Sequence, residues 1–218
     1  MNKKGIIVSG GSICDEFATC YIQEVHPDYM IGVDSGLEFL YRNDVKPTHI
    51  VGDFDSVSPE VIAFYKEKTT IPIREFNPVK DATDTEIAVR LAIELGVNEL
   101  WILGATGTRL DHVMGNIQIL KIALDHGVKA WIVDANNRIS LWKEEVRLEK
   151  EQCFGTYFSL FPFGEEVKNV SIEGAKYPLN DYHMTNNESR CVSNECKEDE
   201  VVITFSEGTM ILMEARDS

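Results

Sequence analysis

Short apolar runs alternate with amphipathic stretches through the first two-thirds of the chain. The runs are almost continuously apolar, as expected of strands that a parallel sheet buries on both faces. They predict strands at residues 5–8, 30–33, 48–51, 70–73, 100–103 and 130–133. Strands that alternate with helices in this way are typical of an α/β sheet with right-handed crossovers.

Helical spacing of apolar residues predicts helices between these strands. In TDTEIAVRLAIELG (83–96), apolar residues recur every three or four positions, and Thr83 with Glu86 has the form of a capping box. The segments 58–68 and 110–126 show the same kind of spacing and end near charged residues or glycine. We therefore expect helices on the faces of the sheet.

The pattern changes after about residue 135. Apolar and polar residues now alternate singly, and the runs VKNVSIEG, EVVITFSEG and TMILMEA are separated by turn-forming residues. This texture predicts a small antiparallel sandwich or barrel. A domain boundary is expected within 134–137, which divides the chain into domains 1–135 and 136–218.

Charge and composition narrow the class of protein. The 218 residues carry a formal net charge of -15, which argues against nucleic acid as a partner because phosphate backbones require basic patches. The early apolar run Ile6–Val8 is too short for a signal peptide or a membrane span, so we expect a cytoplasmic protein with no membrane partner. The 5 cysteines form no CxxC pair, so neither a disulfide framework nor a zinc site is expected.

The most informative polar residues follow the predicted strands. The sequences after five of them are SGGS, DSG, GDFDS, KDATD and GATGTRLDH. Ligands of open parallel sheets bind beyond the carboxyl ends of the strands, so these segments should lie at one edge. That edge would crowd six aspartates: Asp34, Asp53, Asp55, Asp81, Asp84 and Asp111.

Crowded carboxylates repel one another unless a cation neutralises them, although some of these residues, such as Asp81 and Thr83, could simply cap a helix. An all-oxygen set without histidine or cysteine favours Mg²⁺. The glycines, hydroxyls and Arg109 of GATGTR suit phosphate oxygens, and Lys80 adds a positive charge. The residues therefore predict a site for a magnesium-bound nucleotide, without the GxxxxGK or GxGxxG signatures.

The ordered motifs GDFDS, KDATDTEIAV, GATGTRLDHVMGNIQIL, GAKYPLN and VSNE resemble the thiamine pyrophosphokinases over nearly the whole chain. The resemblance implies a Rossmann-like α/β domain, 1–135, that binds ATP and Mg²⁺, followed by a β-sandwich domain, 136–218, that binds thiamine. It also implies transfer of a pyrophosphoryl group from Mg–ATP to the thiamine hydroxyl, with release of AMP.

The resemblance assigns roles residue by residue. It gives the magnesium ligands as Asp53, Asp55 and Asp84. Together with the loop chemistry it gives the nucleotide contacts as Asp34, Lys80, Thr83, Gly104, Thr108, Arg109 and Asp111. The expected catalytic set is Asp53, Asp55, Asp81, Asp84 and Arg109, with Asp81 favoured over Asp84 as the base because a metal ligand is a poorer base. The family commonly has Asp-Gly-Gly where this chain has Asp34-Ser35-Gly36.

The resemblance also places thiamine and a second subunit. Tyr177 is expected to pack on the cationic thiamine ring, with Ser193 and Asn194 beside it. The family's active sites lie at the interface of a homodimer, so the same assembly is expected here.

Two other functions compete with this interpretation. The Asp53-x-Asp55 pair would also suit a metal-dependent nucleotide-sugar transferase, but that function leaves KDATD and GATGTRLDH unexplained. A non-catalytic nucleotide-binding module would hold Mg–ATP without turnover and so release no AMP.

Overall fold

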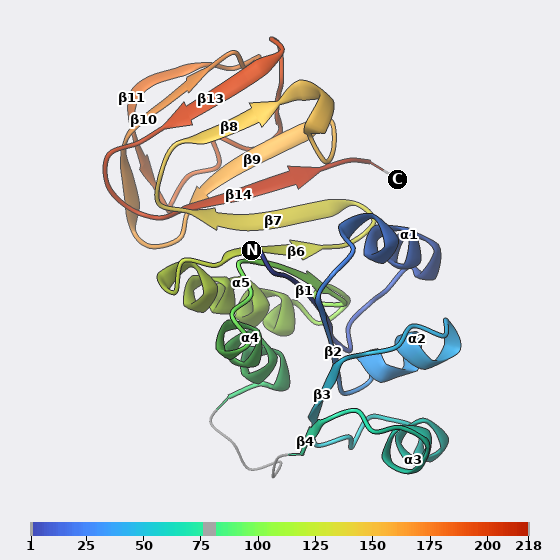
Figure 1. Ribbon diagram of the computed structural model, residues 1–218. Coiled ribbons are helices and arrows are strands. Elements are labelled where there is room, and N and C mark those ends of the chain that lie inside the picture. The colour runs from blue at the N-terminus through green and yellow to red at the C-terminus, as the bar shows by residue number, and fades with distance from the viewer. Residues whose placement is uncertain (1, 76–81, 218) are drawn as a thin grey trace. The chain divides into compact units, whose positions relative to one another are not determined.

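The computed structural model describes residues 2–75 and 82–217, and the chain divides into two compact units, Met1–Ala135 and Asn136–Ser218. The first unit alternates strands with helices, and the second is built mainly of strands (Figure 1). The predicted class, an α/β domain followed by an all-β domain, is confirmed.

The first unit contains a parallel sheet in the order β6-β5-β1-β2-β3-β4. Its strands are β1 (Lys4–Val8), β2 (Tyr29–Val33), β3 (His49–Gly52), β4 (Ile73–Glu75), β5 (Glu99–Leu103) and β6 (Lys129–Val133). The chain builds outward from β1 in one direction through β4 and then in the other direction through β5. Ligands of open α/β sheets bind at such a reversal, beyond the carboxyl ends of β1 and β5.

Helices cover both faces of this sheet. They are α1 (Asp15–Val25), α2 (Gly36–Arg42), α3 (Pro59–Lys68), α4 (Asp84–Glu94) and α5 (Leu110–Asp125). Figure 1 shows α4 and α5 on one face and α1, α2 and α3 on the other. The central strand β1 is consequently enclosed, and Ile6, Ile7 and Val8 each have 0% of their surface exposed. Burial on both faces explains why the strands appear in the sequence as unbroken apolar runs.

Two local predictions have different outcomes. Thr83 caps α4 as predicted, because its hydroxyl accepts a hydrogen bond from the Glu86 backbone N–H at 3.2 Å. The strand predicted at 70–73 is wrong in position, since β4 is Ile73–Glu75. This edge strand is located by its pairing with β3 rather than by an apolar run, and Arg74 and Glu75 are exposed.

The second unit consists of two antiparallel sheets, in the orders β12-β9-β14-β7 and β11-β10-β13-β8. The strands are β7 (Asn137–Trp142), β8 (Val146–Glu149), β9 (Tyr157–Pro162), β10 (Glu166–Glu173), β11 (Leu179–Thr185), β12 (Asn194–Glu195), β13 (Glu200–Thr204) and β14 (Met210–Ala215). A short 3-10 helix, η1 (Lys150–Gln152), lies between β8 and β9.

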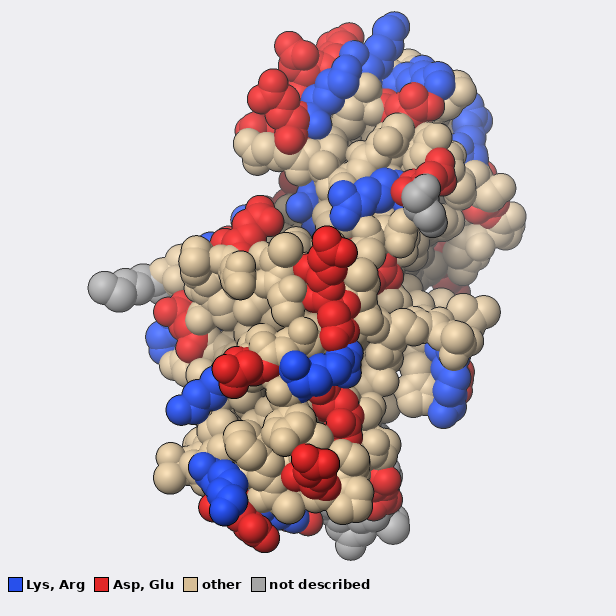
Figure 2. All heavy atoms as spheres, turned by 90° about the vertical axis from the view of Figure 1, so that its right-hand side faces the viewer, with Lys and Arg blue, Asp and Glu red and all other residues tan. Residues whose placement is uncertain are grey.

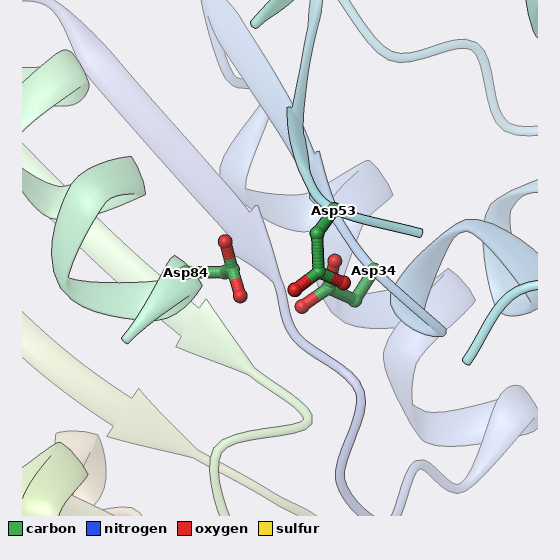
Figure 3. Close-up of side chains that lie close together, drawn as sticks. All are labelled: Asp34, Asp53 and Asp84. Carbon is green, nitrogen blue, oxygen red and sulfur yellow. The ribbon is translucent and has the colours of Figure 1, made fainter. Parts of the chain in front are cut away.

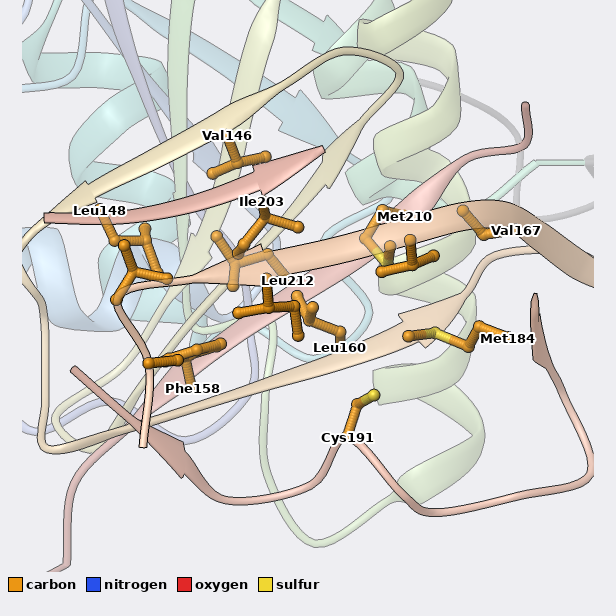
Figure 4. Close-up of a cluster of buried hydrophobic side chains, with 14 residues drawn as sticks. Val146, Leu148, Phe158, Leu160, Val167, Met184, Cys191, Ile203, Met210 and Leu212 are labelled. Carbon is orange, nitrogen blue, oxygen red and sulfur yellow. The ribbon is translucent and has the colours of Figure 1, made fainter. Parts of the chain in front are cut away.

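A shared apolar core joins these two sheets (Figure 4). Phe158, Leu160 and Leu212 from the first sheet pack in one cluster with Val201 and Ile203 from the second. The alternating pattern allowed either a sandwich or a barrel, and the structure shows a sandwich.

On the face shown in Figure 2, charged side chains of both signs are mixed. The net charge of -15 thus singles out no site on that face. Within residues 2–75 and 82–217, none of the helices combines the length and the apolar character that a membrane crossing requires.

Candidate active site

The loops after β1 and β5 are joined by backbone hydrogen bonds at the point where the strand order reverses. Ser9 N–H donates to the Leu103 carbonyl at 2.8 Å, and Gly11 N–H donates to the Gly104 carbonyl at 2.7 Å. Gly104 has φ of +66°, and a Cβ there would collide with the Ser9 carbonyl oxygen. Glycine is required at this position because the two loops approach so closely.

A second glycine brings the acidic residues together. Gly52 ends β3 with φ of +151°, and a Cβ on it would collide with Asp34 Oδ1. Asp34 follows β2, the neighbouring strand, and itself has a left-handed backbone with φ of +43°. The missing side chain at Gly52 therefore makes room for the Asp34 carboxylate directly beside the start of the next loop.

Three carboxylates meet at this edge: Asp34 after β2, Asp53 after β3 and Asp84 at the first position of α4 (Figure 3). One oxygen atom from each lies within 4.8 Å of the others. In Figure 3 the Asp34 and Asp53 side chains lie side by side and the Asp84 carboxylate approaches from α4. We refer to these residues as the carboxylate cluster.

The electrostatics of the cluster are unfavourable without a cation. Burial and the nearby negative charge of Asp84 raise the pKa of Asp34 to about 7, and Asp53 adds to the effect. Asp34 Oδ1 is buried and has no hydrogen-bond partner in the part of the chain that the structure describes. Buried carboxylate oxygens normally have a hydrogen-bond or metal partner, so this oxygen is suited to coordinate a cation.

The donor set of the carboxylate cluster fits a hard divalent cation. All three groups offer carboxylate oxygen, and none offers nitrogen or sulfur. Magnesium takes oxygen ligands and usually combines one or two protein carboxylates with water and substrate phosphates. Asp34, Asp53 and Asp84 are the residues that would hold it.

Asp55 and Asp111 lie outside this cluster. Asp55 is exposed, and its backbone N–H donates to Asp53 Oδ1 at 3.1 Å. Phe54 between the two acids has φ of +66° and a buried ring, so the chain turns and Asp55 does not share the direction of Asp53. Asp111 pairs with Arg109 at 2.6 Å, and this partner lowers the pKa of Asp111 to about 2.

A cavity of about 660 Å³ opens beside the carboxylate cluster. Of the predicted nucleotide contacts, it is lined by Asp34, Thr83, Gly104, Thr108 and Arg109, and Asp84 lines it as well. Its volume is in the range of small-molecule sites. Lys80 and Asp81 lie outside the described residues, so their predicted roles stay predictions.

Two residues that line this cavity, Thr85 and Asn116, were not among the predicted site residues. Ser9 Oγ lies 3.0 Å from Thr85 Oγ1, which links the end of β1 to the start of α4. Asn116 Nδ2 donates to the Ala105 carbonyl at 2.8 Å and so braces the loop after β5 from within α5. Asn116 lies in the motif GATGTRLDHVMGNIQIL, about one and a half turns into the predicted helix. A polar residue so near the start of this helix was the sequence signal that could have identified it.

The predicted thiamine residues lie in the second unit. Tyr177 is 58% exposed, and its backbone is held by Asn194, which is 3% exposed. Asn194 Oδ1 accepts from Tyr177 N–H at 3.0 Å, and Asn194 Nδ2 donates to the Tyr177 carbonyl at 2.9 Å. The adjacent Ser193 has φ of +57°. Asn194 thus fixes the backbone that presents the Tyr177 ring to solvent, and we call the two residues the tyrosine platform.

Comparison with known families gives matches in both units. A model described as "Thiamin pyrophosphokinase, catalytic domain" matches residues 24–132. A second model, described as "Thiamin pyrophosphokinase, vitamin B1 binding domain", matches residues 143–210.

Individual relatives agree with these models. The chain is 32% identical to the thiamine pyrophosphokinase of Bacillus subtilis (strain 168) over 188 residues, which cover 86% of this chain and 87% of the relative. The crystal structure of a Bacillus subtilis thiamine pyrophosphokinase superposes with a TM-score of 0.89 at 32% identity, over 99% of this chain and 100% of that one. The enzyme from Geobacillus thermodenitrificans superposes with a TM-score of 0.83 at 28% identity, over 99% and 98% of the two chains.

Proposed function

The chain belongs to the thiamine pyrophosphokinase family and is an enzyme with that activity, and on this premise we propose how its residues carry the reaction. ATP binds in the cavity beside the carboxylate cluster, and thiamine binds at the tyrosine platform. The products are thiamine diphosphate and AMP.

One observation carries the nucleotide half of this proposal. Asp34, Asp53 and Asp84 bring carboxylate oxygens within 4.8 Å of one another beside the cavity, and Asp34 Oδ1 is buried without a partner among the described residues. Such a cluster is stable when a divalent cation offsets its charge. A bound Mg²⁺ would neutralise part of the phosphate charge. Asp55 lies outside the cluster and remains a predicted further ligand of this ion.

The residues around the cavity position the triphosphate. Backbone N–H groups of the glycine-containing loops suit phosphate oxygens, and the Thr108 hydroxyl and the Arg109 guanidinium add donors. Arg109 is 69% exposed and now pairs with Asp111, so it can exchange this partner for a phosphate at little cost. Lys80 is proposed as a further phosphate contact.

The reaction transfers a pyrophosphoryl group in one displacement. The thiamine hydroxyl oxygen forms a bond to the β-phosphorus, the bond from this phosphorus to the oxygen that bridges to the α-phosphorus breaks, and AMP leaves with that oxygen. The hydroxyl proton passes to a carboxylate, for which Asp81 is favoured over Asp84 because Asp84 is the proposed metal ligand. Catalysis then consists of alignment and of charge stabilisation at the phosphates.

Thiamine recognition rests on an aromatic surface of fixed orientation. The exposed Tyr177 ring offers a π face to the cationic ligand, a contact of about 0.5–2 kcal/mol depending on desolvation. Asn194 holds the Tyr177 backbone by two hydrogen bonds, which fixes the position on the chain from which the ring projects. Ser193 is proposed as a polar contact beside it.

We propose a homodimer in the cytoplasm as the working form of the enzyme. This assembly is supported by the family and not by any contact within one chain. Light scattering of the purified protein tests it, and a monomer that is fully active would remove it. Cell fractionation tests the location.

The decisive experiment incubates the purified protein with thiamine, ATP and Mg²⁺ and separates thiamine diphosphate, thiamine monophosphate and AMP. We expect thiamine diphosphate and AMP in equal amounts, and we expect both to vanish when a chelator is added. Thiamine monophosphate with ADP would instead establish single phosphoryl transfer. ATP binding with no product would favour the nucleotide-binding module, and a requirement for a nucleotide sugar would favour the transferase.

A further inference from the structure

Two cysteines from distant parts of the sequence bring their thiols together in the second unit. Cys153 follows η1 and Cys196 follows β12, and their Sγ atoms lie 3.4 Å apart although both thiols are free. A disulfide bond has a sulfur–sulfur distance of about 2.05 Å, so a small approach of the two side chains would close it.

This pair differs from the other cysteines in its surroundings. Cys14 and Cys20 are exposed in the first unit, and Cys191 is buried in the core of the sandwich (Figure 4). Cys153 and Cys196 are both partly exposed, so a small oxidant can reach them, and each has a second thiol in contact. A neighbouring thiol converts a first oxidation into a reversible disulfide.

We propose that Cys153 and Cys196 form an oxidative modification site that closes to an intramolecular disulfide when the protein meets a hydroperoxide. Two S–H bonds and the O–O bond break, while one S–S bond and two O–H bonds form. The two sulfurs lose two electrons and the peroxide oxygens gain them, so hydrogen peroxide leaves two molecules of water. A dithiol reverses the reaction by exchange.

The resting pair is protected from casual oxidation. Burial, and then the hydrogen bond with Cys196, raise the pKa of Cys153 to about 12. Cys153 therefore remains a thiol at neutral pH, and the thiolate is the reactive form.

The modification would act on the tyrosine platform, a consequence that rests on the proposed function. Cys196 directly follows Glu195, whose carbonyl accepts from Lys176 N–H at 2.9 Å. Asn194 directly precedes Glu195 in the sequence and holds the Tyr177 backbone. Closing the disulfide moves Cys196, which follows β12, toward Cys153; we expect this shift to reach Asn194 and to raise the KM for thiamine about three- to tenfold while the KM for ATP is unchanged.

The test treats the purified full-length protein with hydrogen peroxide and measures intact mass, peptide map and kinetics. We expect a loss of about 2 Da, a cross-linked peptide that joins Cys153 to Cys196, the rise in thiamine KM, and recovery of all three with dithiothreitol. Cys153→Ser and Cys196→Ala should each abolish the cross-link and the kinetic change. Cys14→Ser, which removes an exposed thiol elsewhere, should leave both in place.

The outcomes separate this inference from the proposed function. Oxygen addition without the cross-link, or a cross-link that includes Cys191, overturns the modification site. A correct cross-link with an unchanged thiamine KM overturns the effect on the tyrosine platform. If the reduced protein never forms thiamine diphosphate, the proposed function fails, while the mass and the peptide map still decide whether the disulfide forms.

Discussion

Each unit contains a carboxylate group with a buried oxygen atom, and the two groups differ in their hydrogen-bond partners. In the second unit Glu214 is 3% exposed, and Arg138 donates to both of its oxygens at 2.7 Å while Phe154 N–H donates at 3.0 Å. In the first unit Asp34 lies beside two further acids, and its Oδ1 has no partner among the described residues. A buried charge that is fully paired contributes to structure, whereas one left unpaired in a cavity indicates a ligand site.

The largest effect should come from removing a charge of the carboxylate cluster. We expect Asp53→Asn or Asp84→Asn to lower turnover about 1000-fold, because the offset of phosphate charge is lost with the cation. The folded structure should survive, since each substitution relieves repulsion. Steady-state assays with thiamine and ATP measure the loss, and circular dichroism verifies the fold.

Asp125→Asn is the matched control for that experiment. Asp125 is an exposed aspartate that pairs with Lys121 in the last turn of α5. Its substitution should leave turnover within about twofold of the wild type. A comparable loss in this variant, or most activity retained in Asp53→Asn, would contradict the metal role of the carboxylate cluster.

The opposite result is expected at Glu214. Glu214→Gln should lower the free energy of unfolding by about 3 kcal/mol, because the amide group replaces one of the two carboxylate oxygens to which Arg138 donates and removes the negative charge of this buried ion pair. Urea denaturation measures this change. Turnover of the folded fraction should be almost unaffected, and a selective loss of activity without loss of stability would show that Glu214 is not merely structural.

The stability of the metal-free protein should depend on the protonation of Asp34. The pKa of Asp34 is raised from 3.8 to about 7 in the folded chain, so between these values the folded state holds a proton that the unfolded state has lost. The contribution of Asp34 to stability should therefore be fully present below about pH 4 and should fall as the pH rises to 7. We expect a decrease of about 2 kcal/mol from this residue, less than the full shift implies because Asp34 is partly solvated.

Urea denaturation in a chelator across this pH range measures the slope. Asp34→Asn should remove the Asp34 part of this slope, so stability should fall more steeply with pH in the wild type than in the variant; near pH 7, Mg²⁺ should stabilise the wild type but not the variant. Equal pH slopes in the wild type and in Asp34→Asn would contradict the raised pKa.

The smallest effect is expected at the tyrosine platform. Asn194→Ala removes two hydrogen bonds to the Tyr177 backbone, worth about 1–2 kcal/mol together, and should raise the KM for thiamine about tenfold. The KM for ATP should not change, because the nucleotide cavity lies in the first unit. Ser206→Ala, which removes an exposed hydroxyl that donates to Asn169 elsewhere in the second unit, is the control. Equal rises in both KM values would contradict a role confined to thiamine.

Much of the first unit was predictable because its information is local. Unbroken apolar runs identify strands that are buried on both faces, and the Thr83 cap was visible from its spacing to Glu86. The helix α1 was not named, although Ala18, Ile22 and Val25 carry helical spacing. The edge strand β4 was misplaced because only its pairing with β3 locates it.

The carboxylate cluster was also predictable only in part. The sequence places Asp34, Asp53 and Asp84 at the ends or starts of elements that meet at one sheet edge, so their gathering was expected. The sequence could not show that Asp55 lies outside the cluster, because two acids one residue apart look equivalent until the left-handed backbone of Phe54 separates their directions.

The sequence by itself determined the α/β and all-β halves, the family motifs and the edge at which the acids collect, because hydrophobic period and loop composition act over a few residues. Only the tertiary structure decided which oxygen of Asp34 is left unpaired, that Asn194 holds Tyr177, and that Cys153 faces Cys196. These facts depend on distances between side chains far apart in the chain, and such distances are fixed by the packing of whole elements rather than by neighbours in sequence.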